Sequence, residues 1–144
     1  CLIQGTLITL SDGTTKAIEN IVVGDSVKSM AISEDGMSET TGLVTEIQQV
    51  DVDKVFSIND GLLVVSADHK NVLKQPLSGN TVVTETEFVS LGDKLIDING
   101  VEIEITNKEE VTTPQTVYNI IVENTHSFFA NNTLTYNQIL PTEE

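Results

Sequence analysis

Apolar and polar residues alternate along this chain in short runs separated by turn residues, and no long stretch keeps helical spacing. Residues 33–42 and 75–80 are polar, and we expect each to form a long loop between strands. The pattern predicts an all-β domain with many hairpins. Its strands are expected at residues 6–10, 26–32, 43–50, 54–58, 62–65, 81–84, 94–98, 101–105, 117–122 and 128–130.

A weak internal repeat runs through this pattern. Residues 17–27 match residues 87–95 in their apolar positions and in a Gly-Asp corner, which is Gly24-Asp25 in the first copy and Gly92-Asp93 in the second. Two copies of one supersecondary unit would give the domain two related halves. The alternative is that Gly-Asp is simply common turn chemistry.

Composition narrows the class of protein. A chain of 144 residues with 39% hydrophobic and 4% aromatic residues predicts one domain with a core of Val, Ile and Leu. The net charge of −15 repels phosphate, so we expect neither nucleic acid nor an anionic membrane as a partner. The chain has one cysteine, no secretory signal and no apolar run of membrane-spanning length, which favours a cytoplasmic setting and a monomer.

The two ends of the sequence carry the most informative residues. The single cysteine is Cys1, and Asn137 follows the stretch Thr133-Leu134-Thr135-Tyr136. A thiol can attack the carbonyl carbon of the peptide bond that precedes it, and an asparagine amide can cyclise onto its own carbonyl. Both reactions cut a chain without an outside enzyme, so these positions indicate chemistry on the protein's own backbone.

Four motifs in order resemble those of the hedgehog/intein superfamily, the Hint domains. Cys1, Gly5-Thr6, Asp12-Gly13, Ile18-Glu19 and Gly24-Asp25 are similar to its opening block, and Ser66-Ala67-Asp68-His69 resembles its Thr-x-x-His block with serine for threonine. Residues 117–132 are similar to the late block, and Leu134-Thr135-Tyr136-Asn137 ends where the terminal block ends. These motifs cover nearly the whole chain.

The resemblance implies a flattened, horseshoe-shaped, pseudo-twofold β fold that brings the chain ends together. It also implies a processing domain over residues 1–137, without a homing endonuclease, followed by a downstream flanking segment at 138–144. Three positions depart from the family's pattern. Tyr136 stands where histidine is common before the terminal asparagine, Gln138 stands where Cys, Ser or Thr follows it, and Asn119 replaces a frequent aspartate.

Candidate roles at the upstream end follow from side-chain chemistry. A thiol with a pKa near 8.5 needs a base, and His69 can take up that proton and protonate the departing amide nitrogen. Ser66 can donate a hydrogen bond to the carbonyl oxygen, and Asp68 can orient His69. Each has a structural alternative, because a cysteine or histidine can be a core residue and Ser66 and Asp68 also suit a turn.

At the downstream end, His126 can polarise the Asn137 carbonyl or deprotonate its amide, which replaces the work of the missing penultimate histidine. Tyr136 can donate a phenolic hydrogen bond but is a poor base. Asn137 could instead lie in an exposed tail. One thiol and two separated histidines lack the spacing of zinc ligands, so no metal and no cofactor are expected.

The sequence therefore predicts an autoprocessing domain whose partners are the flanking host segments in cis. Gln138 carries no nucleophile, so cleavage with weak or no ligation of the flanks is expected. Alternatives are an intein that splices by an unusual route and a Hint-like module that has lost its activity. A hedgehog-type reaction with cholesterol is disfavoured, because that group does not need the terminal asparagine block.

Overall fold

A computed structural model describes residues 1–33, 36–74 and 81–136, and the part of the chain that it describes folds into antiparallel β-sheets. One sheet of the described residues has seven strands, in the order β12 (Lys108–Val111), β6 (Val55–Ile58), β7 (Leu63–Val65), β1 (Leu2–Ile3), β13 (Gln115–Val122), β5 (Gly36–Val52) and β4 (Ser26–Ser33). Helical structure there is limited to the short 3-10 turns η1 (Ile18–Asn20) and η2 (Thr86–Phe88). The prediction of an all-β domain is confirmed.

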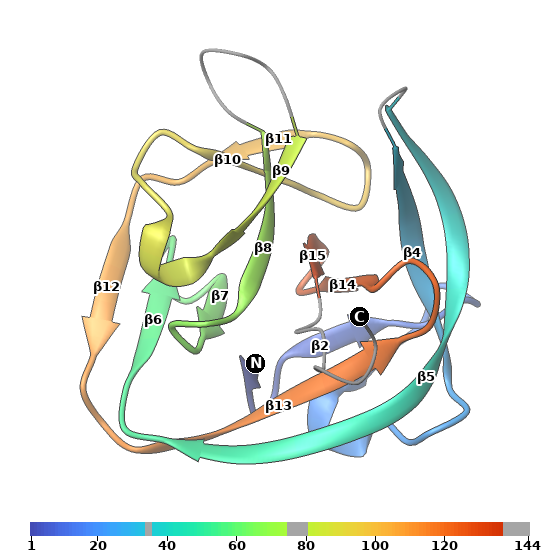
Figure 1. Ribbon diagram of the computed structural model, residues 1–144, viewed down its shortest axis with the longest axis horizontal. Helices are drawn as coiled ribbons and strands as arrows, with labels where there is room; N and C mark the ends of the chain where they lie inside the picture. The colour runs from blue at the N-terminus through green and yellow to red at the C-terminus, as the bar shows by residue number, and fades with distance from the viewer. Residues whose placement is uncertain (34–35, 75–80, 137–144) are drawn as a thin grey trace.

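The second sheet of the described residues has eight strands. Their order is β11 (Glu102–Glu104), β10 (Lys94–Ile96), β8 (Lys70–Lys74), β15 (Thr133–Tyr136), β14 (Ser127–Ala130), β2 (Leu7–Thr9) and β3 (Thr15–Ala17), with β9 (Thr81–Glu85) paired to β8. In Figure 1, β5 and β13 run side by side as a long curved ribbon around one side of the molecule.

The first and last described strands both occupy interior places in their sheets. β1 lies between β7 and β13, and β15 lies between β14 and β8. The N-terminus consequently lies inside the ribbon outline rather than at its edge (Figure 1). Two ends that are 135 residues apart along the sequence are in this way held on central strands.

One predicted loop is wrong. Residues 33–42 were expected to form a long loop, but β4 and β5 pair residue by residue as far as Ser33 and Gly36. The outer part of this hairpin is polar because it has little core to cover, and Ser38 and Glu39 are exposed. Polar composition here reflects a solvated two-stranded ribbon. The other predicted loop, residues 75–80, lies outside the described residues.

The internal repeat is confirmed in the backbone. Ile21 N–H donates to Ile18 O, and Val89 N–H donates to Thr86 O, 68 residues later. The two Gly-Asp corners correspond as well. Gly24 and Gly92 have φ of 98° and 96°, and the Asp25 and Asp93 carboxylates each accept from the backbone N–H three residues earlier. A left-handed φ needs glycine here.

The repeat extends to a second pair of positions. Thr6 N–H donates to Ile3 O and Thr6 O accepts from Ile18 N–H. His69 makes the same two backbone bonds, to Ser66 O and from Thr86 N–H. His69 is therefore the counterpart, in the second half of the fold, of a threonine in the first.

The core is aliphatic, as the composition predicted. Its main cluster contains fully buried residues from both halves, among them Leu2, Ile8, Ile58, Leu63 and Ile120, and buried Phe128 joins them. Within the described residues, no helix has the length and apolar character needed to cross a membrane.

Candidate active site at the chain ends

Cys1 is held in place by both its neighbours in the sheet and its side-chain packing. The residue is 5% exposed and packs with Val55 and Val117. Its carbonyl oxygen accepts a hydrogen bond of 2.9 Å from the Ser66 N–H, which extends the pairing of β1 with β7. The thiol-bearing residue is thus fixed on rigid backbone.

His69 contacts Cys1 directly. The turn Ser66–His69 closes with a hydrogen bond of 3.1 Å from His69 N–H to Ser66 O, and it aims the ring inward. His69 Nδ1 lies 2.8 Å from the Cys1 amino nitrogen, and the side chain is 1% exposed. In a longer chain this amino nitrogen would be the nitrogen of the peptide bond that precedes Cys1. The predicted proton carrier therefore lies at the atom that must receive a proton.

Ser66 and Asp68 form the rim of this cluster. Ser66 Oγ donates a hydrogen bond of 2.7 Å to Asp68 Oδ1. The Ser66 hydroxyl is thus engaged by a carboxylate here, whereas the sequence predicted a donor for a carbonyl oxygen. A hollow of about 480 Å³ adjoins the cluster, lined by Val52, Asp53, Lys54, Ser66, Ala67 and Asp68.

Burial sets the protonation states of the cluster. Desolvation lowers the pKa of the Cys1 amino group from 8.0 to about 5, and the negative charge of Asp68 opposes that shift. Desolvation, followed by the charge of the amino group, lowers the pKa of His69 well below its usual value. Both groups are therefore neutral at pH 7, and one nitrogen of the His69 ring can accept a hydrogen bond.

The other side of the His69 ring contacts Thr135, a residue that sequence reasoning missed. His69 Nε2 lies 2.5 Å from Thr135 Oγ1, and the Thr135 hydroxyl donates to Lys70 O over 3.1 Å. Thr135 is fully buried on β15. The available signal was the pair of threonines at alternate positions, Thr133 and Thr135, in a segment otherwise expected to be apolar.

The downstream candidates form a second group. His126 has a left-handed backbone, with φ of 57°, and its ring centroid lies 6.0 Å from that of Tyr136, at an interplanar angle of 48°. Its Nδ1 is buried without a hydrogen-bond partner among the residues that the structure describes. Burial raises the pKa of Tyr136, so its hydroxyl stays protonated and can only donate or accept neutral hydrogen bonds. Asn137 lies outside the described residues.

Asn119 occupies the place of the family's frequent aspartate. It is buried on β13, and its Nδ2 donates to Gln48 Oε1 over 3.1 Å. An amide has no proton to exchange near neutral pH, so this position offers hydrogen bonding alone.

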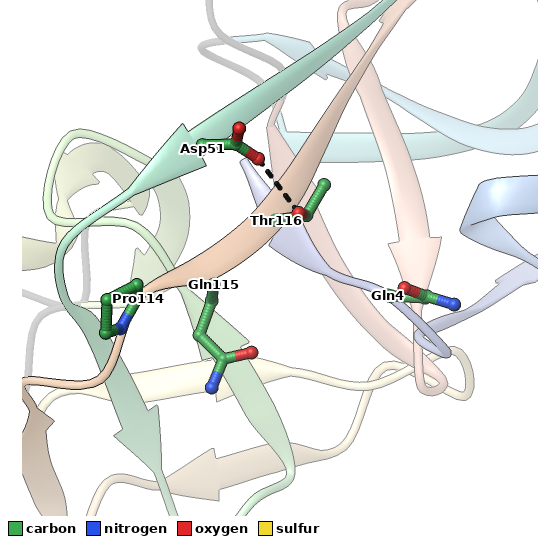
Figure 2. A pocket seen from close by; sticks show the side chains of 5 residues that line it. All are labelled: Gln4, Asp51, Pro114, Gln115 and Thr116. Carbon is green, nitrogen blue, oxygen red and sulfur yellow. Dashed lines mark hydrogen bonds between the residues drawn. The ribbon is translucent and has the colours of Figure 1, made fainter.

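Another hollow is separate from these residues. It measures about 420 Å³ and is lined by Gln4, Asp51, Pro114, Gln115 and Thr116 (Figure 2). Thr116 Oγ1 donates to Asp51 Oδ1 over 2.9 Å across it. None of the predicted site residues lines this hollow. No group of His, Cys, Asp and Glu in the described part of the chain could hold a metal ion.

Comparisons with known proteins agree with this geometry. Residues 7–141 match the family model described as the pretoxin HINT domain. The solution structure of a bacterial intein-like domain from Clostridium thermocellum superimposes with a TM-score of 0.77 and 26% identity, covering 94% of this chain and 97% of that one. The gp41-1 intein superimposes with a TM-score of 0.70 and 23% identity, covering 94% and 97%.

A curated sequence also matches. The catalytic subunit of the V-type proton ATPase from Candida tropicalis is 33% identical over 107 residues, which are 62% of this chain. The match spans about a tenth of that protein's length, 10%. The family match over residues 7–141, together with the fold, shows that this chain belongs to the pretoxin HINT domains of the hedgehog/intein superfamily.

Proposed function

We propose that this domain cuts its own precursor at both ends, through a thioester at Cys1 and through cyclisation of Asn137. Autoprocessing or splicing is general in its family. The observation that carries the proposal is the 2.8 Å contact between His69 Nδ1 and the Cys1 nitrogen. A proton donor or acceptor at that atom serves one purpose in backbone chemistry, which is to let the nitrogen leave the preceding carbonyl carbon.

The upstream step is an acyl shift from nitrogen to sulfur. The Cys1 sulfur forms a bond to the carbonyl carbon of the preceding residue as the thiol gives up its proton. The carbon–nitrogen bond then breaks, and the nitrogen receives a proton from His69 Nδ1. Because burial depresses the pKa of His69, its protonated ring is a strong acid that gives the proton up readily. The net result is an isomer with a thioester and a free amine.

The same burial makes the shift reversible. The product amine has a pKa of about 5 and is therefore neutral and nucleophilic at pH 7. It remains beside the thioester carbonyl and can attack it again. Release of the upstream segment accordingly requires water or an added thiol to capture the thioester, and we expect slow hydrolysis that thiols accelerate.

The downstream step is cyclisation of Asn137 to a succinimide. Its amide nitrogen bonds to its own carbonyl carbon, and the Gln138 nitrogen leaves with a proton. His126 is the group that titrates near neutral pH beside Tyr136, so it serves as the proton carrier. Gln138 cannot accept an acyl group, and the flanks therefore separate instead of joining.

The test is a precursor with a folded marker domain at each end, followed by mass spectrometry. The expected products are two released flanks, upstream release that dithiothreitol or hydroxylamine accelerates, and a downstream cut that leaves a succinimide after Asn137. Cys1→Ala should abolish upstream release, and His69→Ala should slow it roughly a hundredfold or more. Upstream release that persists in Cys1→Ala would refute the thioester.

Other outcomes identify the alternatives. A major product with the two flanks joined by a peptide bond would make the domain a splicing intein. An unchanged precursor in every variant, with the fold intact, would make it an inert interaction module.

A further inference from the structure

The Thr135 hydroxyl links the candidate histidine to the strand that carries the downstream junction. Thr135 Oγ1 lies 2.5 Å from His69 Nε2 and 3.1 Å from Lys70 O. All three atoms belong to buried or half-buried residues of the strand pair β15 and β8, in which Tyr136 stands opposite Lys70. Asn137 follows Thr135 by two residues.

The direction of these hydrogen bonds can be worked out from the inventory of donors and acceptors. A backbone carbonyl only accepts, so Thr135 uses its one hydrogen to donate to Lys70 O. Towards His69 it can then only accept, which requires a hydrogen on Nε2. A neutral ring with a hydrogen on Nε2 has a lone pair on Nδ1.

The precursor demands the same direction from the other end. The peptide nitrogen that precedes Cys1 would have a hydrogen to donate and no available lone pair, so His69 Nδ1 must accept from it. The chain of bonds then runs one way, from Cys1 N–H to Nδ1, from Nε2–H to Thr135 Oγ1, and from the Thr135 hydroxyl to Lys70 O. Hydrogen bonds that run in one direction strengthen one another.

We propose that Thr135 is a positioning residue that fixes the His69 tautomer, with the lone pair of Nδ1 facing the scissile nitrogen, and so enables the upstream acyl shift. The inference rests on the proposed function of His69. It also ties the two ends together, because the same strand that positions Asn137 supplies the acceptor that orients the upstream histidine. The upstream step therefore depends on docking of β15.

The test uses the two-marker precursor with Asn137→Ala, so that upstream release alone is measured, in the presence of dithiothreitol. Thr135→Val removes the acceptor while keeping the side-chain shape, and we expect release to slow at least roughly tenfold. Thr135→Ser keeps the hydroxyl and should stay within about threefold of the parent.

Thr133→Val is the matched control. Thr133 is also fully buried on β15, but its hydroxyl donates to Asn131 O over 3.4 Å and contacts no atom of the candidate site that the structure describes. It should release the upstream domain at nearly the parent rate. Equal slowing in both valine variants would mean that loss of a buried hydroxyl acts through the fold, and would overturn the proposal.

A spectroscopic measurement tests the tautomer without relying on a valine variant. The ¹⁵N shifts of His69 in a Cys1→Ala precursor, which keeps the peptide bond, should show a hydrogen on Nε2 and none on Nδ1. Thr135→Val should mix the two tautomers. A parent ring with its hydrogen on Nδ1 would overturn the proposal even if every variant failed to fold.

The two levels of inference fail separately. Upstream release in a Cys1→Ala precursor would refute the thioester mechanism itself. Cys1-dependent release that is unchanged in Thr135→Val would refute only the role of Thr135.

Discussion

Folding of the processed chain should depend on pH through the buried amino group of Cys1. Burial lowers its pKa from 8.0 to about 5, so the folded state excludes the proton that the unfolded chain binds. Stability from this group is fully present above pH 8 and is lost as the pH falls through 5. Three pKa units correspond to about 4 kcal/mol, and about 3 kcal/mol of that falls between pH 8 and pH 5.

Other groups titrate over the same range, so the measurement needs a matched pair. The buried ring of His69 also has a lowered pKa and acts in the same direction, while protonation of some of the 22 acidic residues relieves repulsion in a chain of charge −15. We would compare two chains that both carry Cys1→Ala, one with a free amino terminus and one acetylated. Acetylation removes the titrating amine and leaves the rest of the sequence unchanged.

The assay is urea unfolding of both chains at pH 8 and at pH 5. The free-amine chain should lose about 3 kcal/mol more than the acetylated chain over this interval. A difference below about 1 kcal/mol would show that the amine keeps its ordinary pKa. The Cys1 nitrogen would then not be desolvated beside His69, and the argument that the acyl shift is readily reversed would fail with it.

Three further outcomes are expected. Gln138→Cys should raise the amount of joined flanks measured by mass spectrometry, and no ligated product would show that the absent nucleophile is not what limits ligation. His126→Ala should slow downstream cleavage roughly a hundredfold while Tyr136→His accelerates it, and equal rates in all three chains would remove His126 from the mechanism. Gly42→Ala should cost about 1–3 kcal/mol in urea unfolding, because its new methyl group meets Val122 Cγ1, and an unchanged midpoint would contradict that packing.

The strands that the sequence predicted share one property, which is alternation over a half-buried surface. Leu63–Val65 and Val55–Ile58 are examples, and both appear within a residue of the expected bounds. The missed strands lack it. Lys70–Lys74 has three consecutive buried residues, and Lys108–Val111 is an edge strand with half of its residues exposed. A fully buried strand and a solvated edge strand both lack alternation.

The candidate site shows a similar division. Motif order was sufficient to pair Cys1 with His69, because a family resemblance assigns chemistry to single positions. Thr135 was not predicted, since its role depends on which strands become neighbours. The contact with His69 exists because β15 pairs with β8, and the sequence separation of 66 residues between the two gives no local signal. Long-range pairing of this kind is set by the whole fold.

The correspondence between Thr6 and His69 gives the molecule an unreactive copy of its own reactive corner. Thr6 donates through its hydroxyl to Ile3 O over 2.7 Å, and a threonine at position 69 could reach Ser66 O in the same way. One half of the fold already demonstrates that this backbone is content without an imidazole. Reactivity in this domain can therefore be gained or lost by changing one side chain, while the architecture that surrounds it stays as it was.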